Sequence, residues 1–153
     1  MLAQQWTYRD ARVRRVSKAI FLYDGVCGLC NRGVQFILRH DAKGSFRFAS
    51  LQSQFAHRAL ARHQLNAADL DTVYVVVDSG GDEALLARSD AVLFVMREIG
   101  GFWRAGAAVL GWLPRRLRDG GYDLVARHRY RVFGRFDTCP VPGENVRSRF
   151  LDV

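Results

Sequence analysis

The sequence has few cysteines, few prolines and no long apolar run. Three cysteines among 153 residues are too few, and odd in number, for the disulfide framework of a small secreted protein. The longest uncharged apolar run in the C-terminal half, 105–113, is far shorter than the ~20 residues that a membrane-spanning helix needs. Residues 1–18 carry five basic side chains and no apolar stretch, so we expect no signal peptide. A reducing cytoplasm is therefore the expected location.

Lysine is also scarce, although the chain is basic. The net charge is +8, and Lys18 and Lys43 leave arginine as 21 of the 23 basic residues. The arginines are scattered, with denser groups at 115–118 and 127–135, whereas a nucleic-acid binder more often gathers them in one stripe. The pattern favours solvated helix faces. Nucleic acid is not an expected partner, and a membrane surface or an acidic protein is the alternative.

Two of the cysteines form the motif Cys27-Gly28-Leu29-Cys30, between an apolar run at 19–23 and a helix-like run at 31–40. A helix N-terminus lowers the pKa of a cysteine through its free N–H groups and its positive dipole end. Two intervening residues let the second thiol attack a mixed disulfide formed by the first. We therefore expect a thiol-disulfide oxidoreductase in which Cys27 attacks and Cys30 resolves.

Metal binding and inert burial are the alternatives for these cysteines. A structural zinc site needs more ligands than one CxxC supplies. The sequence has no second CxxC, and its four histidines are not paired at ligand spacing. We therefore expect redox chemistry and no metal. No cofactor is needed for it, because the two sulfurs carry the electrons.

Apolar periodicity predicts an α/β succession over the first two thirds of the chain. Strands are expected at 19–23, 46–49, 73–77 and 84–87, because these runs are apolar or β-branched. Helices are expected at 31–40, from Leu51 after a Ser50 N-cap, and up to Ile99 after a Ser89 N-cap. The resulting order, β-α-β-α-β-β-α, is that of thioredoxin-like proteins, with the CxxC at the head of the first helix.

The last third of the sequence predicts a helical appendage. One helix is expected at 103–113, ending before Pro114. Another is expected to start at Asp119 or Gly120, with Tyr122 and Tyr130 on its apolar face. These helices are too short to bury a core alone. We predict an N-terminal extension at 1–18 and one domain at 19–153, with 100–153 packed on the sheet.

Three segments are informative when they are considered together: 24–31, 48–53 and 129–134, the last of which is followed by Cys139 and Pro140. Together they resemble the motifs of the DCC family of thiol-disulfide oxidoreductases, whose signature is D-x-x-C-x-x-C. The resemblance extends from about residue 20 to residue 151. It implies a thioredoxin-like fold and dithiol chemistry at Cys27 and Cys30.

Asp24 lies three residues before Cys27, on the turn between strand and helix. A carboxylate there can accept a thiol proton, directly or through a water, as a general base. Ionised and close, it would also raise the thiol pKa and oppose the helix dipole. The alternative is a turn residue that accepts backbone N–H groups.

Four other residues, two of them inside the motif, are candidates for lining the site or tuning its redox potential. Gly28 and Leu29 are expected to tune the redox potential, and Arg32 either favours a thiolate or is simply solvated. Cys139 is either a third thiol or a packing residue. These roles stay open at the level of sequence.

Thr72 is a candidate because of a missing proline. Thioredoxin-like proteins usually place a cis-proline before the third strand, facing the CxxC, but the segment 70–73 has none. A cis bond without proline costs about 3–4 kcal/mol, so we expect a trans peptide or a shifted loop there. Thr72 would then line the site.

The expected partners follow from this chemistry. They are a disulfide-bearing protein or a small thiol compound as substrate, and a dithiol donor that recycles the enzyme. The direction of exchange depends on the redox potential, which the sequence does not determine. Alternative functions are a metal-binding protein that uses the cysteines and a non-enzymatic thioredoxin-like binding module.

Overall fold

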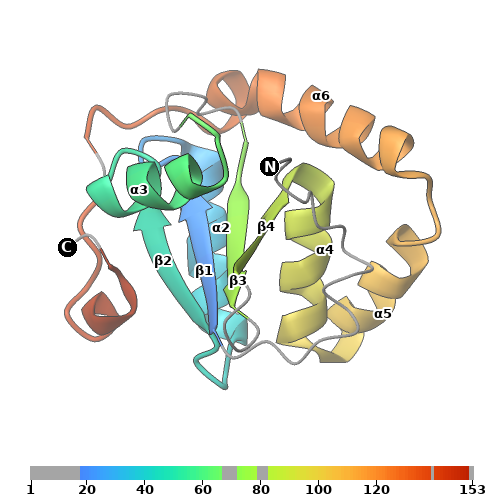
Figure 1. Cartoon of the computed structure of the whole chain (residues 1–153), viewed down its shortest axis with the longest axis horizontal. Coiled ribbons are helices and arrows are strands. Elements are labelled where there is room, and N and C mark those ends of the chain that lie inside the picture. Colours follow the sequence, from blue (N-terminus) through green and yellow to red (C-terminus); the bar gives the residue numbers. More distant parts are fainter. Residues whose placement is uncertain (1–17, 67–71, 79–82, 139, 152–153) are drawn as a thin grey trace.

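The chain folds around a four-stranded mixed sheet (Figure 1). The computed structural model describes residues 18–66, 72–78, 83–138 and 140–151. The strands are β1 (Lys18–Tyr23), β2 (Phe46–Ser50), β3 (Tyr74–Asp78) and β4 (Glu83–Ala87), in the order β2-β1-β3-β4. β1 pairs with β2 in parallel, and the other two pairings are antiparallel.

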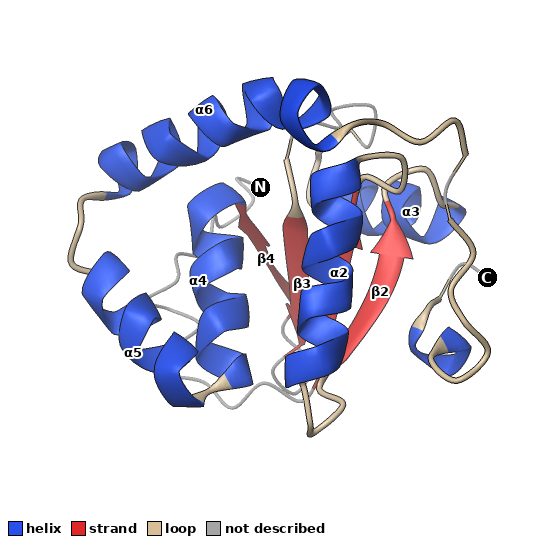
Figure 2. Ribbon diagram, turned by 180° about the vertical axis from the view of Figure 1, so that it is seen from behind, coloured by secondary structure: helices blue, strands red, loops and turns tan. Residues whose placement is uncertain are grey.

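Helices cover both faces of the sheet. α2 (Gly28–His40) and α4 (Arg88–Ile99) lie on one face and α3 (Gln54–Arg62) on the other (Figures 1 and 2). Alternate residues of a strand point to opposite faces. In β1, Phe21 therefore packs in the core on the α2 side and Leu22 in the core on the α3 side. Both faces are buried, which explains the unbroken apolar run at 19–23.

The order β1-α2-β2-α3-β3-β4-α4 confirms the predicted α/β, thioredoxin-like fold. The predicted start of α3 was wrong. Ser50 belongs to β2, where it pairs with Tyr23, because the parallel pairing carries the strand that far. Ser53 caps α3 instead, and its Oγ accepts the Ala56 N–H at 3.1 Å.

The predicted N-cap of α4 was also wrong. The helix starts at Arg88 with Ala87 as its N-cap. The Ser89 hydroxyl donates to the Asp119 carboxylate at 2.5 Å, so it joins α4 to a distant helix rather than capping its own. The predicted end at Ile99 is confirmed, with Gly100 following at φ 81°.

Two further helices form the C-terminal part, α5 (Gly101–Leu110) and α6 (Arg115–Phe133). The prediction for α5 was two to three residues late at both ends. The prediction that the last helix starts at Asp119 or Gly120 was wrong. The helix begins directly after Pro114 and includes Gly120 and Gly121. Side chains of its first two turns bind the start of α4: Arg115 and Arg118 form ion pairs with buried Asp90.

α6 crosses the ends of α2 and α4, and α5 packs on α4 (Figure 2). A short 3-10 helix, η1 (Arg147–Arg149), follows and lies against β2, where Arg149 donates to the Phe46 carbonyl. Among these C-terminal elements, η1 therefore contacts the sheet, and α5 and α6 contact the helices α2 and α4. The segment 1–17 of the predicted extension lies outside the described residues.

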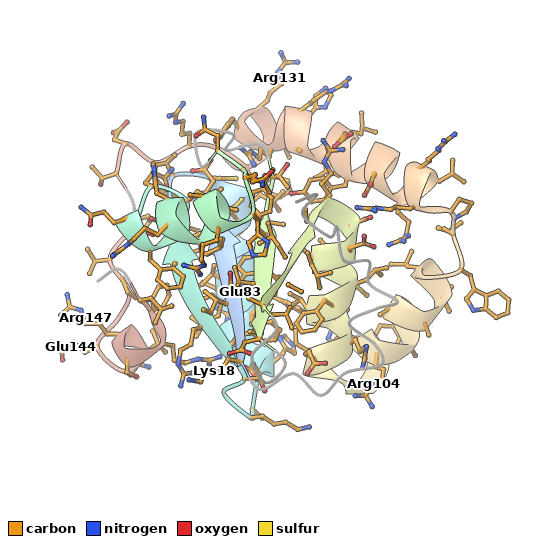
Figure 3. The ribbon with its side chains drawn as sticks, viewed as in Figure 1. Lys18, Glu83, Arg104, Arg131, Glu144 and Arg147 are labelled. Atoms are coloured by element: carbon orange, nitrogen blue, oxygen red, sulfur yellow. The ribbon has the colours of Figure 1, made fainter. Side chains whose placement is uncertain are left out.

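The charge is spread over the surface. Figure 3 shows Arg104, Arg131 and Arg147 pointing away from the core at three separate places, and all three are exposed. Arginine thus serves largely as a solvated surface residue, apart from the buried arginine described below. None of the helices in the part of the chain that the structure describes is long and apolar enough to cross a membrane.

Candidate active site

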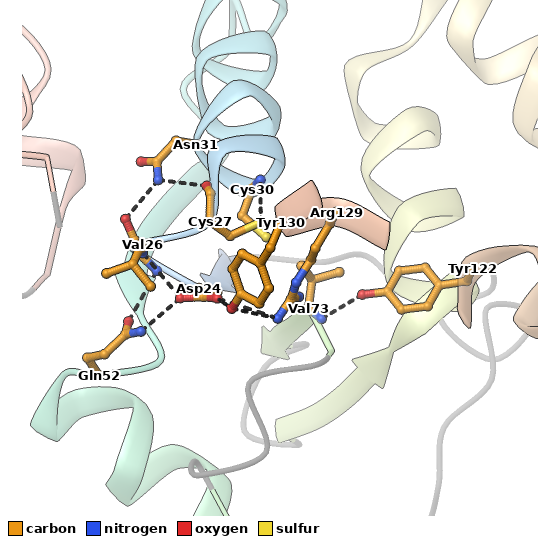
Figure 4. Close-up of polar contacts among 11 residues, drawn as sticks. Asp24, Val26, Cys27, Cys30, Asn31, Gln52, Val73, Tyr122, Arg129 and Tyr130 are labelled. Atoms are coloured by element: carbon orange, nitrogen blue, oxygen red, sulfur yellow. Dashed lines mark hydrogen bonds and ion pairs between the residues drawn. The ribbon is translucent and has the colours of Figure 1, made fainter. Parts of the chain in front are cut away.

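The two cysteines lie where β1 gives way to α2 (Figure 4). Cys27 is the N-cap of α2, and its Sγ accepts the backbone N–H of Cys30 at 3.4 Å. Both are free thiols and both are buried: Cys27 is 0% exposed and Cys30 is 7% exposed. The structure therefore brings the pair together at the helix N-terminus, as the motif predicts, and encloses the first sulfur completely.

The surroundings shift the pKa values of the two cysteines in opposite directions. A hydrogen bond from the Cys30 thiol lowers the pKa of Cys27 to about 6, despite the opposing effect of burial; the Cys30 and Leu29 backbone N–H groups and the Arg129 charge also lower it. The same thiol-thiol hydrogen bond raises the pKa of Cys30 well above its usual range, and burial adds to the shift. Near neutral pH the pair therefore holds one proton, on Cys30.

Asp24 lies beneath this pair with its carboxylate fully buried. One oxygen accepts the Val26 N–H at 3.1 Å and Gln52 Nε2 at 2.8 Å. The other accepts the Tyr130 hydroxyl and lies 3.4 Å from Arg129 Nη2. These partners compensate the cost of burying the charge. The same guanidinium thus neutralises Asp24 and lowers the pKa of Cys27.

The turn that carries the motif is fixed from two sides. Gln52 accepts the Gly25 N–H at 3.1 Å while it donates to Asp24. Asn31 Nδ2 donates to the carbonyls of Gly25 at 2.8 Å and Cys27 at 2.9 Å. Both amide side chains therefore hold the backbone that presents Cys27.

The chain after α6 closes over the motif; we call residues 133–136 the covering segment. The Gly28 N–H donates to the Gly134 carbonyl at 3.1 Å, and the Phe136 N–H donates to the Val26 carbonyl at 2.7 Å. Cys27 forms an isolated β-bridge with Arg135. This segment therefore covers the backbone on both sides of Cys27, at Val26 and at Gly28.

Gly28 makes that close approach possible. A Cβ at this position would lie 2.1 Å from the Phe133 carbonyl oxygen, a distance at which the backbone must move. The first residue between the two cysteines, Gly28, is thus constrained by its packing against the end of α6. Its second member, Leu29, is half-buried.

The remaining predicted site residues lie as follows. Arg32 is exposed, and its guanidinium lies over the Phe133 ring, 5.4 Å from the centroid; the cation that acts on Cys27 is Arg129 instead. Thr72 is 6% exposed and lies directly before Val73, whose N–H donates to Tyr122. No peptide bond among the described residues is cis. Cys139 lies outside the described residues.

The described residues contain no cluster that could hold a metal ion. Across residues 18–66, 72–78, 83–138 and 140–151, no group of three or more His, Cys, Asp or Glu side chains is arranged to hold a metal ion. The proposed metal ligand set of Cys27, Cys30 and Cys139 includes a residue outside these ranges.

Sequence reasoning missed Arg129, Tyr130, Gln52 and Asn31 as individual site residues. Arg129 is 105 positions from Asp24, and no local pattern joins two residues so far apart. A signal was nevertheless present: Arg129 follows Val125 and Ala126 at helical spacing, so it lies on the face predicted to be apolar. A buried arginine on that face needs an acidic partner, and Asp24 was available.

Comparison with known proteins points the same way as the geometry. Residues 21–135 match a family model described as DCC1-like thiol-disulfide oxidoreductase. The chain is 33% identical over 137 residues to the Bacillus subtilis protein YuxK, an alignment covering 90% of this chain and 96% of YuxK. It is 38% identical over 122 residues to a chloroplastic DCC family protein of Arabidopsis thaliana, covering 80% of this chain and 69% of the relative. No solved structure matches the chain significantly.

Proposed function

We propose that this chain, which belongs to the DCC1-like thiol-disulfide oxidoreductase family, transfers electrons through a reversible disulfide between Cys27 and Cys30. The observation that carries the proposal is the environment of Cys27. Cys27 is the N-cap of α2, and its sulfur accepts hydrogen bonds from Cys30. The charge of Arg129 also acts on this sulfur. Each of these contacts stabilises a thiolate, the reactive form of cysteine.

The reaction proceeds by two exchanges. The Cys27 thiolate attacks one sulfur of a substrate disulfide, and the other substrate sulfur leaves as a thiolate that takes up a proton. Cys30 then loses its proton and attacks Cys27 in the mixed disulfide, which releases the second substrate thiol. Two electrons and two protons pass to the substrate, and a partner dithiol restores the reduced enzyme.

Asp24 is the proposed acceptor of the Cys30 proton. The raised pKa of Cys30 makes proton loss the demanding part of the second exchange. The Cys30 sulfur is next to the Asp24 backbone N–H, and the carboxylate of the same residue is proposed to receive the proton through a water. Tyr130 and Arg129 hold that carboxylate in place.

The proposed substrates are disulfides of proteins or small molecules, and the proposed recycling partner is a dithiol. A reducing compartment such as the cytoplasm supplies such donors. The same chemistry in reverse would oxidise a substrate, so the direction is set by the potential of the partner.

Trapping of the mixed disulfide tests the order of attack. A Cys30→Ala variant should accumulate covalent adducts with a disulfide substrate through Cys27, because the resolving thiol is missing. The matched Cys27→Ala variant keeps Cys30, whose pKa is still raised by burial, and should accumulate fewer adducts. Equal adduct formation in both variants, measured by mass spectrometry without reductant, would contradict the assigned roles.

A further inference from the structure

A large apolar cavity opens beside the cysteine pair. It has a volume of about 550 Å³ and lies between α2, α4 and α6. Its walls include Leu29, Val73, Leu93, Leu117 and Val125, and Cys30 is also among its lining residues. This size is within the range of about 300–1,000 Å³ that small-molecule sites occupy.

The polar side chains on the cavity wall are already engaged with protein groups. Tyr122 accepts the Val73 N–H at 2.8 Å, and Ser89 donates to Asp119 at 2.5 Å. Arg118 and Arg129 are paired with the buried carboxylates of Asp90 and Asp24. An occupant therefore meets mainly aliphatic surface, which favours an apolar molecule and disfavours one with several charges.

A ligand can approach the cysteine sulfurs more easily through the cavity than from the opposite side. Cys27 is 0% exposed, and the covering segment closes the other side through two backbone hydrogen bonds. Cys30 keeps 7% exposure and lines the cavity. On the cavity side a ligand meets the side chain of Cys30, which is hydrogen-bonded to Cys27, whereas the opposite approach requires displacement of the backbone.

We propose that this cavity binds the substrate of the dithiol and that the substrate is a small apolar disulfide, such as a cyclic disulfide on an aliphatic chain. The proposal rests on the proposed function and adds the class of substrate. The aliphatic chain packs along the leucine and valine side chains, and the disulfide lies at the Cys30 end.

The chemical step balances without a further reactant. The Cys27 thiolate bonds to one ligand sulfur, and the ligand S–S bond breaks. Cys30 then attacks Cys27, the enzyme disulfide forms, and the ligand leaves as a dithiol. The ligand gains two electrons and two protons: the enzyme pair supplies both electrons and the Cys30 proton, and solvent supplies the second proton, because Cys27 reacts as a thiolate.

Binding can be tested separately from exchange in a full-length Cys27→Ser/Cys30→Ser variant, with lipoamide as the probe. Gly121 lines the cavity and a Cβ there meets no atom within 4 Å, so a Gly121→Leu change added to this variant introduces a side chain at the cavity wall whose Cβ has free space. Its neighbour Gly120 has the same free surroundings but does not line the cavity, so Gly120→Leu is the matched control. Calorimetry should show lipoamide binding that Gly121→Leu weakens at least about tenfold and Gly120→Leu leaves unchanged.

Exchange is then compared in the enzyme with both cysteines. The kcat/KM for lipoamide should exceed that for oxidised glutathione, which carries several carboxylates and ammonium groups, by at least about tenfold. Insulin, a folded protein disulfide, should react more slowly than lipoamide. Gly121→Leu should lower the rate with lipoamide and leave the Cys27–Cys30 equilibrium with dithiothreitol unchanged.

Three results would overturn the inference. The first is lipoamide binding that Gly121→Leu does not affect, and the second is no lipoamide binding at all. The third is a kcat/KM for oxidised glutathione or for insulin that equals the kcat/KM for lipoamide. None of these alters the dithiothreitol equilibrium, which reports the proposed function itself. A protein that binds lipoamide but forms no reversible disulfide would instead overturn the proposed function and the exchange step with it.

Discussion

Substitution of Gly28 by alanine should open the enclosed cysteine. The new Cβ would lie 2.1 Å from the Phe133 carbonyl oxygen, so the covering segment has to move. Movement breaks the hydrogen bonds between Gly28 and Gly134 and between Phe136 and Val26, which are 3.1 and 2.7 Å long. At about 0.5–1.5 kcal/mol for each bond, the closed state loses about 1–3 kcal/mol, a factor of about 5–150 in the opening equilibrium.

Alkylation of Cys27 by iodoacetate measures this change. The reagent is charged, so the apolar cavity disfavours its entry and it depends on displacement of the covering segment. We expect Gly28→Ala to raise the alkylation rate by the same factor of about 5–150. The rate should be measured at a pH well above the Cys27 pKa of about 6, so that changes in protonation do not contribute.

Gly33→Ala is the matched control, because Gly33 lies in the same helix and a Cβ there meets nothing within 4 Å. It should leave the alkylation rate unchanged and stabilise the protein by up to about 1 kcal/mol, since alanine favours the helix. Equal alkylation rates in wild type and Gly28→Ala would refute the reasoning that the covering segment encloses Cys27.

Three further predictions concern the charges around the pair. First, the alkylation rate of Cys27 should rise with pH around a midpoint near its pKa of about 6 and level off above it; a midpoint near 9 would contradict the thiolate. Because this folded-state pKa lies below the ordinary cysteine value of about 9, reduced protein should gain stability as pH rises from about 6 to about 9 and lose it as pH falls, which denaturant melts can follow. Second, Arg129→Gln should raise the midpoint and destabilise the fold by about 3–5 kcal/mol, since Asp24 stays buried without its cation; exposed Arg131→Gln is the control and should change neither. Third, Asp24→Asn also destabilises the fold, because Arg129 then stays buried without its anion, but under conditions where the variant is folded it should slow disulfide exchange; unchanged kinetics across pH would remove Asp24 from the mechanism.

The motif and the element order were predictable from the sequence because they depend on local patterns. β-branched runs predict strands, and a CxxC before an amphipathic run predicts a cysteine at a helix start. The structure confirms the fold with small shifts of the ends. The larger errors occur where one residue type fits two places: Ser50 and Ser53 are both suitable N-caps, and pairing of β2 with β1 decides between them.

The start of α6 was missed for a related reason. Gly120 and Gly121 weaken a helix locally, and the prediction placed its start there. Tertiary contacts overcome that weakness, because Arg115 and Arg118 bind Asp90 and Asp119 binds Ser89. None of these pairs is visible in the local pattern.

Of the site, only the position of the cysteine pair at the start of a helix was predictable from the local sequence. The enclosure of Cys27, the steric role of Gly28 and the pairing of Asp24 with Arg129 all depend on where α6 ends in space. Residues more than 100 positions apart form these contacts. The cavity likewise forms from three helices, and each contributes a face that the sequence pattern describes simply as apolar.

The most direct test of the account is the equilibrium between the protein and mixtures of oxidised and reduced dithiothreitol, read by peptide mass spectrometry. The account predicts one reversible two-electron transition, with the loss of two hydrogens confined to the peptide that contains Cys27 and Cys30. Thiols that stay reduced across the whole range, or a disulfide that joins either cysteine to Cys139 instead, would contradict it.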